Sequence, residues 1–181
     1  MSTPRPAEFA DLWVSDRQRQ NAAYSSMLDA TASPVPWADD VWDEVVANLK
    51  HADNHNRSIA AQLLCNLAAN DRHERVLGDL DALMEVTRDP RFVTARHSLQ
   101  SLWRIGLGGD TQRRAIVAAL AERYAEGATE KNGTLIRSDI VKSLRQLHDA
   151  VGDPDLETTA RALIETETDP KYRRKYAGHW K

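Results

Sequence analysis

Histidines with nearby acidic residues are the first groups in this sequence that could do chemistry, because imidazole and carboxylate groups together bind transition metals. The chain contains six histidines. His51 and His55 have the i, i+4 spacing that places two side chains on one face of a helix, but Asp53 and Asn54 between them are typical of a turn. We therefore expect no metal site and no cofactor.

The stretch Gly106-Leu107-Gly108-Gly109 has the glycine content of a phosphate-binding loop. Such loops connect a strand to a helix, whereas this stretch follows a segment with helical periodicity. We therefore interpret it as the end of a helix, with Gly106 as the stop, rather than as a phosphate site.

The last eleven residues combine positive charge with aromatic rings. Residues 171–181 hold five Lys or Arg, together with Tyr172, Tyr176 and Trp180. Basic residues interleaved with aromatic ones can bind single-stranded nucleic acid. The aromatic residues also follow one another at four-residue steps, which favours a helix that caps the end of the domain. Both interpretations stay open, and we prefer the cap.

Three segments of the chain resemble one another when they are aligned on an arginine. Arg57, Arg96 and Arg137 each hold the second place of a similar segment, and they follow one another after 39 and 41 residues. The segments are 56–67, 95–106 and 136–147; their fifth places hold Ala60, Leu99 and Ile140, and their ninth places hold Leu64, Trp103 and Leu144. Arg19 is a candidate for the same place in an earlier copy. Helix pairs that repeat after about 40 residues are typical of HEAT or armadillo solenoids.

Through this repeat the chain resembles HEAT-repeat proteins, whose pattern is Asp-x-x-x-Val-Arg-x-x-Ala-x-x-Ala-Leu. The resemblance covers residues 37–150 best. It implies an all-α fold, a right-handed α-α superhelix of about five HEAT-like helix pairs. It also implies that Arg57, Arg96 and Arg137 form a structural ladder with acidic groups, and Asp53 and Asp89 are candidate partners. Direct contact of these arginines with a ligand is the alternative.

Apolar periodicity and turn residues predict which elements must position these groups. No segment has the alternation of a strand. We expect one domain, 1–181, with an irregular capping repeat at 1–34, regular repeats at 37–150 and a C-terminal cap at 153–181. The expected helices are 7–14, 16–31, 37–50, the Arg57 helix, 76–87, the helix before Gly106, 111–126, the Arg137 helix, 153–165 and a short one after Asp169-Pro170.

The second helix of each pair normally lines the concave side of such a solenoid. If places one, five, eight, nine and twelve are buried, then places three, seven and ten face outward. Those outward places hold Ser58, Gln62, Cys65, His97, Ser101, Arg104, Ser138, Lys142 and Arg145. The candidate binding groove consists of Gln62, His97, Ser101, Arg104, Lys142 and Arg145, and it is neutral at one end and basic at the other. It is either a solvated face or a groove for an acidic peptide or polyanion.

Composition limits the class of protein. A chain of 181 residues that is 41% hydrophobic and 28% charged is long enough for one domain with a proper core. Residues 1–90 hold 8 basic and 15 acidic side chains, and residues 91–181 hold 16 basic and 12 acidic ones.

A single cysteine excludes an internal disulfide. We expect Cys65 to be a small buried residue, with a reactive thiol as the alternative. We see no signal peptide and no apolar run that would span a bilayer, and expect a cytoplasmic protein.

Two enzyme classes with HEAT-like folds are alternatives to a binding role. His73-Glu74 resembles the His-Glu pairs of HEAT-type deoxyhypusine hydroxylases, but that family holds two irons with several pairs, and this chain has one. HEAT-like alkylpurine DNA glycosylases use aromatic residues and an acidic residue beside a basic face; here Trp103 is expected in the core. The sequence favours a non-catalytic module or scaffold that binds a protein partner, with a nucleic-acid-binding protein resembling those glycosylases as the alternative.

Overall fold

The computed structural model describes residues 4–181, and within that range it is all-helical, without strands. The α-helices are α1 Arg17–Thr31, α2 Ala38–Asn48, α3 Asn54–Ala68, α4 Val76–Val86, α5 Phe92–Ser101, α6 Asp110–Glu126, α7 Gly133–Val151, α8 Pro154–Glu165 and α9 Pro170–Ala177. The 3₁₀-helices are η1 Ala7–Trp13, η2 Leu102–Leu107 and η3 Gly178–Trp180. The all-α prediction is confirmed. In the described range no helix is long and apolar enough to cross a membrane.

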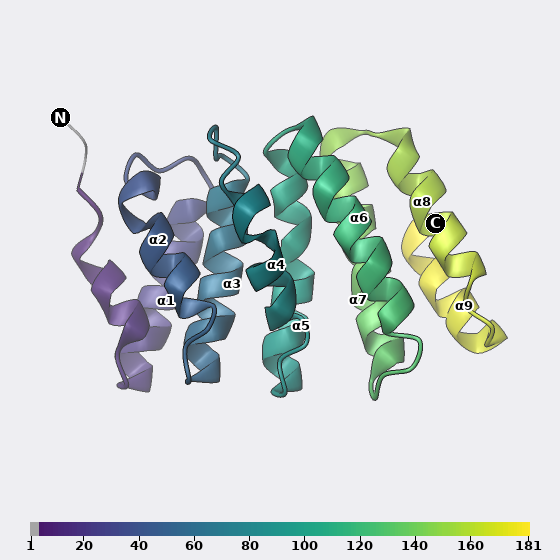
Figure 1. Cartoon of the computed structure of the whole chain (residues 1–181), viewed down its shortest axis with the longest axis horizontal. Coiled ribbons are helices and arrows are strands. Elements are labelled where there is room, and N and C mark those ends of the chain that lie inside the picture. The colour runs from purple at the N-terminus through teal and green to yellow at the C-terminus, as the bar shows by residue number, and fades with distance from the viewer. Residues whose placement is uncertain (1–3) are drawn as a thin grey trace. The chain divides into compact units, whose positions relative to one another are not determined.

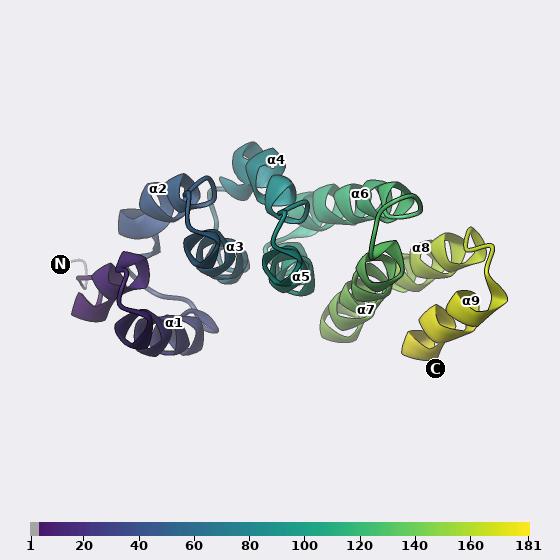
Figure 2. The same cartoon turned by 90° about the horizontal axis from the view of Figure 1, so that it is seen from below.

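The chain divides into two compact units, Met1–Ser98 and Leu99–Lys181. In the first unit α3 packs against α1, α2 and α4, and in the second α7 packs against η2, α6, α8 and α9. Each unit has two layers of helices (Figures 1 and 2). In the first unit, one layer contains α2 and α4 and the other contains α1 and α3. In the second unit, one layer contains α6 and α8 and the other contains α7 and α9.

Aspartate side chains begin most of the helices that were expected to come second in a pair. The carboxylates of Asp16, Asp53, Asp89 and Asp169 each accept a hydrogen bond from a backbone N–H two residues later, at 2.8–2.9 Å. Such N-caps satisfy N–H groups that have no partner inside the helix. Pro170 follows as the first residue of α9, where its missing N–H costs nothing. These starts agree with the predicted turns.

The segment before Gly106 differs from its prediction, because the α-helix ends at Ser101 and continues as the 3₁₀-helix η2. Gly106 does not stop the helix: it is buried within η2, where an added Cβ would lie 2.6 Å from a methyl group of Leu147. A 3₁₀-helix has three residues per turn, so side chains rotate away from the α-helical phase. Trp103 is therefore only partly buried.

The other two copies keep α-helical geometry at this place. Leu64 on α3 and Leu144 on α7 are 0% exposed. On η2 the buried side chains are instead Leu102 and Ile105, at 0% and 1%. The prediction of a core residue at the ninth place is thus correct for two copies and fails in part for the third.

Candidate functional site

The repeat arginine Arg57 forms a two-pronged ion pair with Asp89. Its Nε and Nη2 donate to the two carboxylate oxygens at 2.6 and 3.1 Å, and only 2% of the Asp89 side chain is exposed. Its Nη1 donates to the carbonyl oxygens of His51 and Ala52, both at 2.8 Å. The hydrogen bond to Asp89 raises the pKa of Arg57. The guanidinium of Arg57 thus has a structural role.

Arg137 on α7 forms the equivalent pair in the second unit. Its Nη1 donates to Glu167 at 2.7 Å, and both side chains are 8% exposed. Its Nη2 donates to Thr166 at 3.2 Å, and its guanidinium lies over the ring of Tyr124, 4.0 Å from the centroid. This arginine is also part of the structural framework.

The earlier copy of this arginine is Arg17 and not Arg19. Arg17, 40 residues before Arg57, donates to Asp53 at 2.5 Å, whereas Arg19 pairs with Asp11. Burial alone would raise the pKa of Asp53, but hydrogen bonds from Arg17 and from the backbone and ring of His55 lower it to about 2. Arg96 holds the corresponding place on α5 and is half-buried; its ladder partner stays a prediction.

The groove candidates differ in exposure. His97 and Lys142 are exposed, and Gln62, Arg104 and Arg145 are half-buried. Ser101 was expected to face outward, but it is 6% exposed. It lies where α7 packs against the end of α5, marked by the hydrogen bond from Ser143 to the carbonyl of Leu99 at 2.9 Å. Three other outward places are buried as well, namely Ser58, Cys65 and Ser138.

Hydrogen bonds between neighbouring second helices explain much of this burial. In the first unit, Tyr24 of α1 donates to Gln62 of α3 at 2.8 Å, and Ser58 lies 3.3 Å from His97 of α5. The polar side chains at these places therefore hold adjacent helices together. Gln62 and His97 therefore contribute to contacts between neighbouring helices of the first unit.

The second unit has a basic face where η3 and α9 meet α7, formed by Lys142, Arg145, Lys175 and His179. His179 Nε2 lies 3.0 Å from Ser138 Oγ on α7. Burial lowers the pKa of His179, and so do the charges of Lys142 and Lys175, so both lysines lie within electrostatic range of the imidazole. Within residues 4–181 neither lysine has an ion-pair partner.

Within residues 4–181, Arg145 is the one member of the basic face that forms an ion pair with a carboxylate. Its Nε donates to Asp149 at 2.7 Å, and its guanidinium lies 5.6 Å from the ring centroid of Trp180. Arg104 is on η2, which packs against α7, and its guanidinium lies over the Trp103 ring at 4.9 Å.

The C-terminal tail packs onto α7. Tyr176 and Trp180 are 0% and 5% exposed; their side chains donate to the carbonyls of Thr134 and Val141 at 3.0 and 3.2 Å. Two of the three tail aromatics are thus unavailable for stacking with bases. Three cationic side chains of α9 are exposed to solvent, namely Lys171, Arg174 and Lys175. The helix contains no carboxylate.

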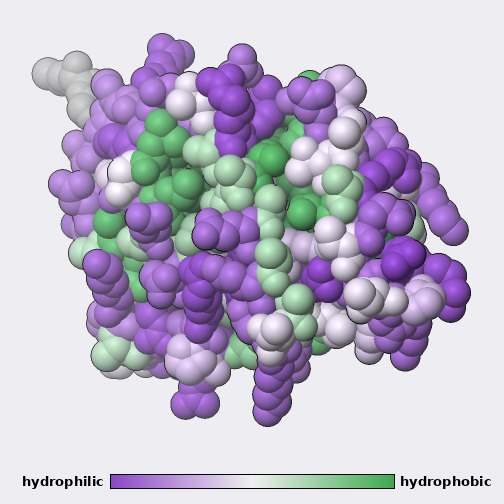
Figure 3. Space-filling view, turned by 45° about the vertical axis from the view of Figure 1, so that its right-hand side comes forward, coloured by the Kyte–Doolittle hydropathy of each residue, from purple (hydrophilic) through white to green (hydrophobic). Residues whose placement is uncertain are grey.

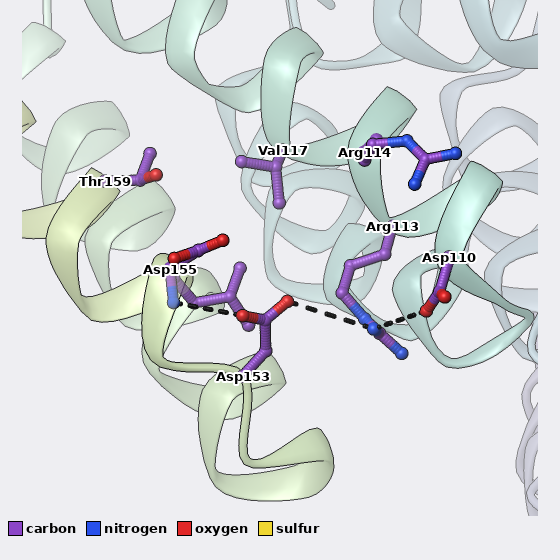
Figure 4. Close-up of a pocket in the computed structure, with 8 residues that line it drawn as sticks. Asp110, Arg113, Arg114, Val117, Asp153, Asp155 and Thr159 are labelled. Carbon is purple, nitrogen blue, oxygen red and sulfur yellow. Dashed lines mark hydrogen bonds and ion pairs between the residues drawn. The ribbon is translucent and has the colours of Figure 1, made fainter.

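A cavity of about 300 Å³ lies between the N-terminal ends of α6 and α8 (Figure 4). The side chain of Arg113 lies between Asp110 at 2.9 Å and Asp153 at 3.9 Å. Asp153 is also the N-cap of α8. Arg113 is held by carboxylates at the two helix ends, so we assign the cavity a structural role and no chemistry.

The histidines expected not to bind metal have local structural contacts. His51 Nδ1 accepts a hydrogen bond from the backbone N–H of Asp53 at 2.9 Å, and His55 Nδ1 lies 3.2 Å from the carboxylate of Asp53. In the described part of the chain no three His, Cys, Asp or Glu side chains are grouped so that they could hold a metal ion.

The face visible in Figure 3 is mostly hydrophilic, with apolar residues reaching it between polar side chains. Among residues 4–181, the large hydrophobic residues that are exposed are Val93 at 66% and Leu107 at 37%. Two such residues make no extensive apolar docking surface.

Comparison with known proteins adds no family to this description. No family model matches the sequence, and no curated protein shows significant similarity to it.

Proposed function

We propose that this protein is a non-catalytic, HEAT-like repeat module that binds an acidic segment of a protein partner through the basic face. The observation that carries the proposal is that Lys142 and Lys175, which lower the pKa of His179, have no ion-pair partner within residues 4–181. By contrast, the guanidinium groups of Arg57 and Arg137 are held by carboxylates. Unpaired cations near one another repel, and an anionic partner removes that repulsion.

The HEAT-like superhelix is part of this proposal. Arginines at 40-, 39- and 41-residue intervals and the packing of successive helices within each unit support it. We expect the two units to continue one right-handed superhelix of about five helix pairs, forming one domain. A crystal structure, or small-angle scattering compared with the superhelical and other arrangements, tests this directly.

A labelled acidic peptide tests the binding function. Its fluorescence anisotropy should rise on titration with the protein, whereas a peptide of the same length with Asn and Gln in place of Asp and Glu should bind much more weakly. The complex should weaken as salt is added, because exposed charges are screened over about 8–10 Å. Equal binding of both peptides would count against a charge-based site.

A charge-reversal variant locates the site. Replacing Lys142→Glu and Lys175→Glu should weaken acidic-peptide binding by about tenfold or more, since it puts two repulsive charges in the basic face. The control variant Lys50→Glu with Lys131→Glu changes the net charge equally at two exposed positions elsewhere. It should bind as the parent does. A similar loss in both variants would show an effect of net charge alone.

Nucleic-acid binding is the second candidate, because α9 carries four cations and no carboxylate. Burial of Tyr176 and Trp180 weakens it, since base stacking needs exposed rings. Labelled DNA measured at about 50 and 200 mM salt separates the two functions: phosphate contacts give a steep loss of affinity with salt. Binding of DNA that exceeds binding of the acidic peptide would favour this candidate.

The proposal also includes a cytoplasmic location and the absence of catalytic activity. Fractionation of host cells with an antibody against the protein tests the first.

A further inference from the structure

Two ammonium groups and two hydrogen-bonding side chains converge where α7 meets the end of the chain. Ser138 and Lys142 are four residues apart on α7, so they lie on one face of that helix. Lys175 and His179 are also four residues apart, but they lie in α9 and in the 3₁₀-helix η3, so their proximity is indicated by the effect of Lys175 on the pKa of His179 and not by the spacing. The 3.0 Å contact between Ser138 Oγ and His179 Nε2 brings the two pairs together.

The charged groups around His179 leave this place positive. From α7, Asp139 opposes the two lysines, but it is 6% exposed and Gln100 Nε2 lies 3.4 Å from its carboxylate. Arg145 is paired with Asp149, and its Nη1 lies 3.5 Å from the carbonyl oxygen of His179.

From α8, Arg161 extends toward the same end of the chain. Its Nη2 lies 3.4 Å from the carbonyl oxygen of Trp180, and its guanidinium is paired with Glu157. No described carboxylate pairs with Lys142 or Lys175.

We infer that the basic face binds the phosphate group of a phosphorylated serine or threonine in the partner segment; this inference rests on the proposed function. A phosphate monoester carries −1.5 to −2 charges and three acceptor oxygens. It matches two ammonium groups and the donors at Ser138 and His179. A carboxylate carries one charge and leaves one lysine uncompensated. A nucleic-acid phosphodiester also carries one charge per group, which favours the phosphopeptide.

Binding of the phosphate is coupled to protonation of the His179 imidazole. Burial and the two lysines disfavour the imidazolium in the free protein. A bound phosphate reverses the effect of the lysines, so His179 takes up a proton; its Nε2–H then donates to Ser138 Oγ, and the Ser138 hydroxyl is left to donate to the phosphate. A variant with Gln at this position keeps a hydrogen-bonding side chain but cannot titrate, which makes it the matched comparison.

The experiment uses the full chain and three labelled peptides that differ at one position, which holds phosphoserine, serine or glutamate in the same acidic sequence. We expect the phosphoserine peptide to bind about tenfold more tightly than the serine peptide and more tightly than the glutamate peptide. Lys142→Gln with Lys175→Gln should abolish this difference. Lys171→Gln, which removes an exposed lysine one helical turn further from His179 along α9, should preserve it.

The pH dependence is read as the ratio of the affinities of the parent and His179→Gln for the phosphoserine peptide, because titration of the phosphate itself cancels in that ratio. The ratio should rise as the pH falls from about 7.5 to about 6. Circular dichroism of each variant establishes that it is folded.

Three outcomes would overturn the inference. If the acidic peptides bind alike with or without phosphate, the phosphate site is wrong and the proposed function stands. If no peptide binds, both fail. If labelled DNA or vesicles of anionic lipid bind more tightly than the phosphoserine peptide and lose binding in the same double variant, the face recognises polyanions in place of a phosphopeptide.

Discussion

The guanidinium of Arg57 and the carboxylate of Asp89 form a two-pronged ion pair across 32 residues of sequence. The same carboxylate accepts the backbone N–H of Arg91 at 2.8 Å, just before α5. Asp53 serves the same two purposes for Arg17 and for the start of α3. Each pair thus ties one second helix to the beginning of the next within the first unit.

Removing the cation of the Arg57–Asp89 pair should destabilise the protein. Arg57→Met leaves a nearly buried carboxylate without its partner, which typically costs about 3–5 kcal/mol. Urea unfolding followed by circular dichroism measures the loss. Adding Asp89→Asn should recover much of it, since Asn carries no charge and still caps the Arg91 N–H. A double variant as unstable as Arg57→Met alone would contradict the ion-pair explanation.

Trp103→Phe should be neutral or slightly stabilising. The indole Nε1 is buried and has no hydrogen-bond partner within residues 4–181, and an unsatisfied buried donor costs about 1–3 kcal/mol. Phenylalanine removes this donor and keeps most of the ring that Arg104 covers. Trp103→Ala should destabilise, by less than the about 3–5 kcal/mol typical of a fully buried tryptophan. Thermal melts compare the three proteins; a large loss in the Phe variant would indicate an acceptor for the indole.

Gly133→Ala should destabilise the second unit strongly. A Cβ at Gly133 would lie 1.8 Å from the carbonyl oxygen of Gly127, so the turn before α7 must open, at a cost of about 1–3 kcal/mol or more. Gly78→Ala on α4 is the matched control. Nothing lies within 4 Å of its Cβ, and alanine favours a helix by up to about 1 kcal/mol over glycine. The denaturant concentration at the midpoint of unfolding should therefore fall for Gly133→Ala and rise for Gly78→Ala.

Stability should depend on the charge state of His179. Burial and then Lys142 and Lys175 lower the pKa of His179 below its ordinary value of 6.5. The unfolded chain thus takes up this proton at a higher pH than the folded protein, and stability falls as the pH drops through 6.5 toward the folded pKa. The melting temperature of His179→Gln should fall less over that interval. Parallel curves for parent and variant would rule out this contribution.

Arg104 and Arg145 should both contribute to anion binding. They lie on η2 and α7, which pack against each other. Arg104→Glu with Arg145→Glu should abolish binding of the labelled acidic peptide without unfolding the protein. Because Arg145 also pairs with Asp149, Arg145→Glu with Asp149→Lys restores a local ion pair of reversed sign and controls for its loss. Binding unchanged in the Arg104, Arg145 variant would exclude both from the site.

Much of the helical organisation could be predicted from the order of residues, because its causes are local. Aspartate before proline begins α8 and α9, and apolar periodicity identifies α2, α3 and α7. The acid that pairs with Arg57 could be proposed as well, since the repeat places Asp89 just before the next copy. The N-terminal segment 7–14 was recognised as helical, but its 3₁₀ geometry in η1 was not.

The site depended on contacts between distant parts of the chain. Lys175 and His179 carry no signal that relates them to Ser138 and Lys142, because that relation arises only when the tail packs on α7 through Tyr176 and Trp180. Likewise Ser101 occupies an outward place in an ideal α-helix, yet it is 6% exposed in the folded chain. Hydrogen bonds along one helix are decided by neighbouring residues, whereas burial and local charge are decided by whatever folds against that helix.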